Sequence, residues 1–111
     1  MSVEREAVVH RKLVRDRIPE IVEAAGRVPA TRVLTVAELV PALLAKLHEE
    51  ATELGLAEPE ERLEELADVH EVLSALTTAY GFTEEDVTRA AREKKAARGG
   101  FSERVWLEEV R

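Results

Sequence analysis

Apolar residues in the first half of the chain recur every three or four positions, the spacing of an α-helix with one buried face. Residues 15–25 form the first such segment, which Gly26 ends. A capping-box pattern, Thr35 followed by Glu38, opens a second helix that runs to about residue 57. Pro41 removes one backbone donor in this span, so the helix either bends there or begins there. Its apolar stripe is Leu39, Leu43, Leu47, Ala51 and Leu54.

The second half of the chain predicts two more helices and an apolar tail. Pro59 starts a third helix, which ends before Gly81. Thr83 caps a fourth helix that runs to Arg98 and stops at two glycines. The tail, residues 101–111, is rich in apolar side chains, so we expect it to pack on the bundle or on a second subunit. The core face expected for the third helix is Leu63, Leu66, Val69, Leu73 and Leu76.

These segments predict an all-α fold: an antiparallel bundle of about four helices, completed by oligomerisation, in a single domain over residues 1–111. A chain of 111 residues buries only a modest core. It contains no cysteine, so we expect neither disulfides nor a thiolate zinc site. Residues 1–12 lack an apolar signal core, and no stretch is apolar for the length of a bilayer. We therefore expect a cytoplasmic protein with no membrane partner.

Two short acidic clusters lie on the second and third predicted helices. Glu49, Glu50 and Glu53 share one helical face, and Glu65 and Asp68 share another. If the two faces meet, up to five carboxylates gather around one point. Such a group is strongly repulsive by itself, but with a hard divalent cation it becomes an all-oxygen binding site. Oxygen ligands of this kind favour Mg²⁺, Mn²⁺ or Ca²⁺.

The charge of the chain is segregated. Between Leu47 and Thr88 there are 13 acidic residues and one basic residue, Arg62, so this stretch carries −12 and the rest of the chain +5. A solvated acidic face accounts well for Glu60, Glu61, Glu64 and Glu71. It accounts poorly for Glu50 and Asp68, which border the apolar stripes, because a carboxylate that loses hydration requires a partner. The net charge of −7 and the absence of a basic, aromatic stripe argue against a nucleic-acid partner.

The histidines do not extend the acidic clusters into a di-iron site. Helical bundles hold di-iron through Glu-x-x-His pairs, but Ala45 and Ala67 lie three residues before His48 and His70. We therefore interpret both histidines as packing residues.

The order of these motifs resembles the signature of the MazG-like, all-α nucleoside triphosphate pyrophosphohydrolases. An E-E-x-x-E motif at residues 49–53 precedes E-x-x-D at residues 65–68, and the basic residues of K-K-A-A-R-G-G-F at 94–101 look like those of the family's following helix. The opening K-L-V-R-D-R-I-P, residues 12–19, resembles a small single-domain branch described as phosphoribosyl-ATP pyrophosphohydrolase-like. The resemblance covers nearly the whole chain, although the opening of true histidine-biosynthesis enzymes is absent.

This resemblance implies Mg²⁺-dependent hydrolysis of a nucleoside triphosphate, or a related nucleotide, to the monophosphate and pyrophosphate by a homodimer or homotetramer. Mn²⁺ is a possible substitute for Mg²⁺, and non-standard nucleotides are possible substrates. Glu49 would hold a second metal or orient the attacking water. By motif position, the metal ligands would be Glu50, Glu53, Glu65 and Asp68. The substrate-binding residues would be Lys94 and Arg98, with Lys12 and Arg15 adding to them from the first helix.

Two features leave alternatives open. The nucleotide base could stack on the aromatic residues, although Trp106 is equally suited to anchor the tail. The whole chain could also be a non-catalytic helical oligomer, an interaction or regulatory module that retains the bundle. The aromatic residues are Tyr80, Phe82, Phe101 and Trp106.

Overall fold

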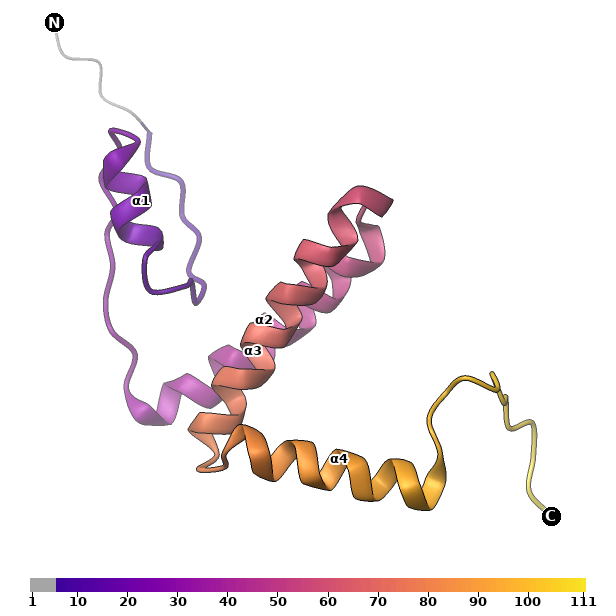
Figure 1. Ribbon diagram of the computed structural model, residues 1–111. Helices are drawn as coiled ribbons and strands as arrows, with labels where there is room; N and C mark the ends of the chain where they lie inside the picture. The colour runs from indigo at the N-terminus through magenta and orange to yellow at the C-terminus, as the bar shows by residue number, and fades with distance from the viewer. Residues whose placement is uncertain (1–5) are drawn as a thin grey trace, which may run out of the picture. The chain divides into compact units, whose positions relative to one another are not determined.

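The computed structural model describes residues 6–111, all of whose regular elements are helical, so the all-α prediction is confirmed. The sequence predicts no apolar core of a signal peptide in residues 1–12, and residues 1–5 of that stretch lie outside the described residues. No described helix is long and apolar enough to cross a membrane. The elements are α1 (Ile18–Ala24), α2 (Val36–Leu56), the 3₁₀ helix η1 (Pro59–Glu61), α3 (Arg62–Ala79) and α4 (Glu84–Arg98) (Figure 1).

The predicted caps define where the longer helices begin. Thr35 Oγ1 accepts a hydrogen bond from the Glu38 backbone N–H, and the Glu38 carboxylate accepts one from the Thr35 backbone N–H. Thr83 and Asp86 form the same reciprocal pair at the start of α4. Because Thr35 caps α2, this helix begins at Val36 and continues through Pro41, which resolves the alternative that the sequence left open.

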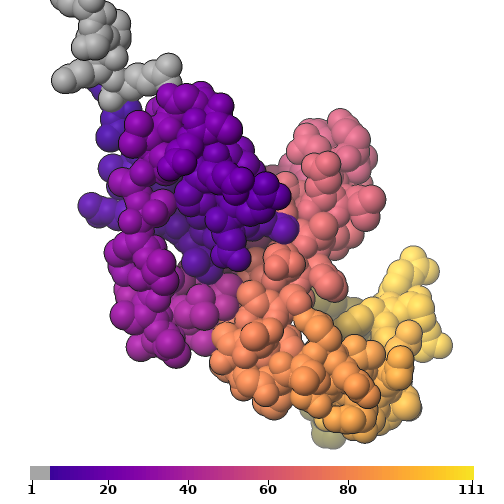
Figure 2. Space-filling model, turned by 60° about the vertical axis from the view of Figure 1, so that its left-hand side comes forward, coloured from indigo at the N-terminus to yellow at the C-terminus, as the bar shows by residue number. Residues whose placement is uncertain are grey.

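The chain divides into two compact units, Met1–Leu76 and Thr77–Arg111. The first contains α1, α2, η1 and most of α3; the second contains the last turn of α3, α4 and the tail. In the space-filling view, α1, the segment before it and the connector toward α2 form one continuous surface (Figure 2).

The core of the first unit lies between α2 and α3, which pack side by side (Figure 1). Among the described residues, the buried apolar side chains are Leu43 of α2 and Val72 and Leu76 of α3. Leu43 meets the later part of α3, whereas Glu50 meets the earlier part, so the two helices run antiparallel. Partly buried side chains surround this core: Leu13, Leu39, Val40, Leu47 and Ala75.

The side of α3 that faces α2 differs from the predicted one. Leu76 is buried as expected, but Leu63 is 78% exposed, Leu66 is 52% exposed, and Leu73 is also exposed. The buried side is instead the row that continues from Glu65 and Asp68 to Val72 and Leu76. The predicted core face is therefore wrong for three leucines. Because α3 carries apolar residues on two arcs, periodicity alone could not identify the arc that meets α2.

One further expectation about packing differs from the structure, and another is only partly tested. His48 and His70 are exposed, so their interpretation as packing residues is wrong for the single chain. In the second unit, α4 has no buried residue among those described. The tail is not buried in the single chain, and its packing on a second subunit stays a prediction. Its exposed apolar side chains are Phe101, Val105, Trp106, Leu107 and Val110.

Candidate functional site

Three carboxylates from the two acidic motifs meet between α2 and α3. Glu50 on α2 and Glu65 and Asp68 on α3 each offer one oxygen, and these three oxygens lie within 4.8 Å of one another. Glu65 and Asp68 share a face because they are three residues apart in a helix. Glu50 is only 5% exposed, whereas Glu65 and Asp68 are half-buried. The structure thus brings together three of the four residues that the sequence assigns as metal ligands.

Two oxygens of this group are buried without a hydrogen bond. Glu50 Oε2 and Glu65 Oε2 are shielded from solvent and have no partner among the described residues. Such an acceptor costs about 1–3 kcal/mol, and more when it carries charge. Loss of hydration, together with repulsion from Asp68 and Glu50, raises the pKa of Glu65. A hard divalent cation fits this set, since it would ligate the two oxygens and offset the repulsion.

Two of the three carboxylates, those of Glu50 and Asp68, are each held by a cation through one oxygen. The Lys46 Nζ lies 3.2 Å from Glu50 Oε1, and the Arg15 Nη2 donates a hydrogen bond of 2.7 Å to Asp68 Oδ1. Arg15 comes from the segment before α1, 53 residues away from Asp68 in the sequence. This hydrogen bond places Arg15 at the acidic group, and its contact with substrate stays a prediction.

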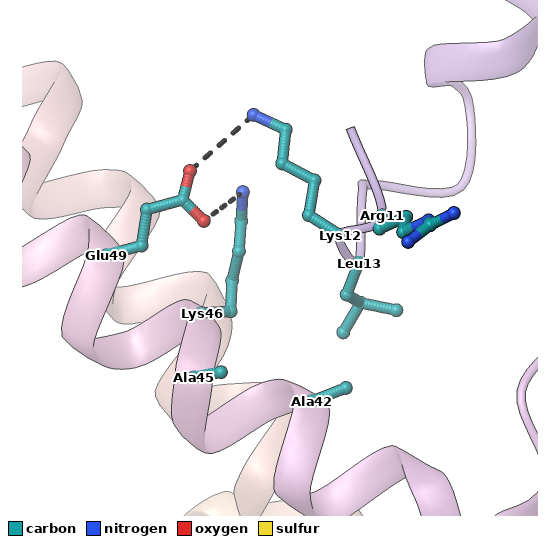
Figure 3. A pocket seen from close by; sticks show the side chains of 7 residues that line it. All are labelled: Arg11, Lys12, Leu13, Ala42, Ala45, Lys46 and Glu49. Atoms are coloured by element: carbon teal, nitrogen blue, oxygen red, sulfur yellow. Dashed lines mark ion pairs between the residues drawn. The ribbon is translucent and has the colours of Figure 1, made fainter. Parts of the chain in front are cut away.

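Glu49 lies beside the group and faces a small pocket. Its Oε1 is 3.5 Å from Lys12 Nζ and its Oε2 is 3.6 Å from Lys46 Nζ. Figure 3 shows the two lysines reaching separate oxygens of Glu49, while Arg11 extends away from them. The pocket has a volume of about 140 Å³. It is lined by Arg11, Lys12, Leu13, Ala42, Ala45, Lys46 and Glu49.

The segment that carries Lys12 and Arg15 is anchored by Leu13. This side chain packs against the core of Leu43, Val72 and Leu76, so the two flanking cations are held near the acidic residues. Sequence reasoning did not identify Leu13. Its signal was the apolar pair Leu13 and Val14 between basic residues, a pattern that can attach a segment to a core.

The remaining predicted site residues lie outside the three-carboxylate group. Glu53 is exposed on α2, one turn after Glu49 and Glu50. Partial loss of hydration and repulsion from Glu50 raise the pKa of Glu53, which indicates that its carboxylate lies near the group. Lys94 and Arg98 lie one turn apart on α4 in the second unit, with exposed side chains. Their contact with substrate stays a prediction.

Comparison with known proteins gives one informative match. The chain is 53% identical over 47 residues to an uncharacterized protein of Mycolicibacterium smegmatis. The match covers 42% of this chain and 48% of the relative, so the chain spans about half the length of the curated relative it matches. No family model matches the chain. No solved structure matches it either.

Proposed function

We propose that this protein is a Mg²⁺-dependent nucleotide pyrophosphohydrolase, which converts a nucleoside triphosphate or a related nucleotide to the monophosphate and pyrophosphate. The observation that carries the proposal is the pair of buried, unpartnered oxygens of Glu50 and Glu65 beside Asp68. The motif order that resembles the MazG-like pyrophosphohydrolases supports the same reaction. Non-standard nucleotides are the proposed substrates.

In this proposal the carboxylates bind the cation and the basic side chains bind the phosphates. Glu50, Glu65 and Asp68 would hold Mg²⁺ or Mn²⁺, and Glu53 is the further ligand that the family resemblance implies. When bound, the ion neutralises phosphate charge and polarises the phosphoryl oxygens. Glu49 would orient the attacking water and accept its proton at a carboxylate oxygen. The phosphates would be bound by the cationic side chains of Lys12, Arg15, Lys94 and Arg98.

We also propose that the helices form an antiparallel bundle completed by a second copy of the chain, as a dimer or tetramer. Leu63, Leu66, His70 and Leu73 follow one another at intervals of three, four and three residues along α3. This is the spacing of residues that face a partner helix in a coiled coil. Leu63 and Leu66 are exposed in the single chain, so a partner helix would remove their apolar surface from water.

A phosphate-release assay tests the catalytic proposal. The protein is incubated with Mg²⁺ and a panel of nucleotides, and inorganic pyrophosphatase converts released pyrophosphate to phosphate. We expect turnover that depends on both Mg²⁺ and the added pyrophosphatase, with one equivalent of nucleoside monophosphate formed per pyrophosphate. Phosphate release without the added pyrophosphatase would instead indicate hydrolysis of the terminal phosphate.

The exposed leucines of α3 favour a second candidate function, a non-catalytic interaction or regulatory module. Folded, metal-loaded protein that associates with itself but turns over no nucleotide in the panel would select this alternative. The same protein sample, assayed for turnover and for self-association, therefore distinguishes the two hypotheses.

A further inference from the structure

Lys46 occupies a position between the two adjacent acids of α2. Its ammonium group lies 3.2 Å from Glu50 Oε1 and 3.6 Å from Glu49 Oε2, and its side chain is only 18% exposed. The side chain also lines the pocket in Figure 3. One cation is therefore shared by a residue proposed to bind metal and a residue proposed to orient water.

Helix stability alone does not account for this arrangement. A lysine that precedes a glutamate by four residues is the less favourable order for an ion pair on a helix. The burial of Glu50 accounts better for the ion pair with Lys46, because a carboxylate with so little exposure requires a charged or hydrogen-bonding partner. Lys46 satisfies only Oε1 of Glu50 and leaves Oε2 buried and unpartnered among the described residues, in the group with Glu65 and Asp68.

We infer that Lys46 is a positioning residue, which holds Glu50 through Oε1 so that Oε2 is presented to the metal ion. The inference rests on the proposed function, because it assigns a role within the same candidate centre. Side chains that bond to a ligating carboxylate fix its orientation, and their loss typically lowers metal affinity about 10–100-fold. Lys46 itself touches neither the ion nor the reacting atoms.

Lys12 provides a matched control for the loss of a positive charge. Its described ion pair is with Glu49, at 3.5 Å, and it does not hold Glu50 among the described contacts. The Lys12→Met variant thus removes a nearby charge, which favours cation binding, and leaves the Glu50 carboxylate oriented. The difference between Lys46→Met and Lys12→Met therefore isolates the orientation of Glu50 from the general electrostatic effect.

The test is a calorimetric titration of each nucleotide-free protein with Mn²⁺. We expect Lys46→Met to lower Mn²⁺ affinity about tenfold or more. We expect Lys12→Met to retain or slightly raise the affinity, and Lys46→Arg, which keeps a cationic donor, to restore most of it. Binding of Mn²⁺ by Lys46→Met as tight as that of the wild type, or tighter, overturns the inference.

The wild-type titration separates this inference from the proposed function. A wild-type protein that binds no Mn²⁺ contradicts the metal-dependent function itself, whereas wild-type binding with an unaffected Lys46→Met contradicts only the positioning role. Far-UV circular dichroism establishes that each variant is folded. If Lys46→Met is unfolded, Lys46→Gln replaces it, since this shorter, neutral side chain loses the ion pair with Glu50 Oε1. We then expect Mn²⁺ affinity below that of the wild type and of Lys46→Arg, and wild-type affinity in Lys46→Gln would overturn the inference.

Discussion

At the scale of single residues, the candidate centre consists of carboxylates whose two oxygens have different surroundings. Glu50 has an ammonium group at Oε1 and no described partner at Oε2, and Asp68 has a guanidinium at Oδ1. If ion pairs satisfied both oxygens of each acid, the fold would be stabilised, but no carboxylate oxygen would be left to ligate a cation. Unsatisfied buried acceptors are rare in folded proteins, and here they lie where a cation would be bound.

The substitution Asp68→Asn is expected to abolish turnover while it leaves the fold intact. The substitution removes one negative charge from a group of mutually repelling carboxylates. It also removes the ion pair between Asp68 and Arg15, which is partly exposed. The free energy of unfolding should therefore change by less than about 1 kcal/mol. Nucleotide turnover and urea unfolding in metal-free buffer measure the two effects.

Glu64→Gln is the matched control for Asp68→Asn. Glu64 is an exposed acid on α3 that lies outside the three-carboxylate group. We expect this variant to retain turnover. Loss of folding in Asp68→Asn under metal-free conditions would show instead that Asp68 has a structural role.

At the scale of secondary-structure elements, α2 begins at a charged cap that is separate from the candidate centre. The Arg32 guanidinium donates two hydrogen bonds to Glu38, whose carboxylate also accepts bonds from Thr35. The bonds from Arg32, then those from Thr35, lower the pKa of Glu38 to about 2. A carboxyl group whose pKa is lower in the folded state stabilises the fold at any pH above its ordinary pKa.

This cap predicts a specific loss of stability in acid. The contribution of Glu38 is complete above its ordinary pKa of 4.5 and is lost as the pH falls to about 2. Carboxyl chemical shifts measured by NMR should place the midpoint of Glu38 near 2. In Arg32→Met the midpoint should move up toward 4.5, and an unchanged midpoint would show that Arg32 does not hold Glu38 in solution.

The elements were predictable from the sequence, but their pairing was only partly so. Caps such as Thr35 and Thr83 act locally, so their residues identify the starts of α2 and α4 directly. Helical spacing predicted that Glu65 and Asp68 share a face, but the meeting of that face with Glu50 was a condition of the metal-site hypothesis that only the structure could test. The side of α3 that faces α2 could not be predicted from the sequence, because Leu63 and Val72 lie on different sides of this helix and both sides carry apolar residues. The pairing of Arg15 with Asp68 is a tertiary contact across 53 residues of sequence, which the local pattern does not predict.

At the scale of the whole molecule, the chain buries little apolar surface for its length. Three apolar side chains are buried among the described residues, whereas large apolar side chains are exposed on α3 and in the tail. Small domains bury a low fraction of their surface and often gain stability from association. A second copy would supply the missing burial through the α3 leucines.

This shortage of core predicts that folding is coupled to association. We expect the wild type to sediment as a species heavier than 12.4 kDa and its thermal midpoint to rise with protein concentration. Leu66→Asp should shift the protein toward the monomer, because it places a charge on the exposed apolar arc of α3. Analytical ultracentrifugation measures the shift.

Val33→Asp is the control for this experiment. Val33 is 94% exposed in the connector before α2, outside any helix, so a charge there should leave association unchanged. Equal sedimentation of wild type and Leu66→Asp would exclude this arc of α3 as the contact.

The different directions in which Glu65 and Leu66 point have a practical consequence. Consecutive residues on a helix are turned about 100° from each other, so a change that disrupts the leucine surface need not disturb the acids. A Leu66→Asp monomer that remains folded should therefore keep Glu50, Glu65 and Asp68 together. If the proposed nucleotide hydrolysis is found for the wild type, turnover by such a monomer would show that one copy of the chain is sufficient for it.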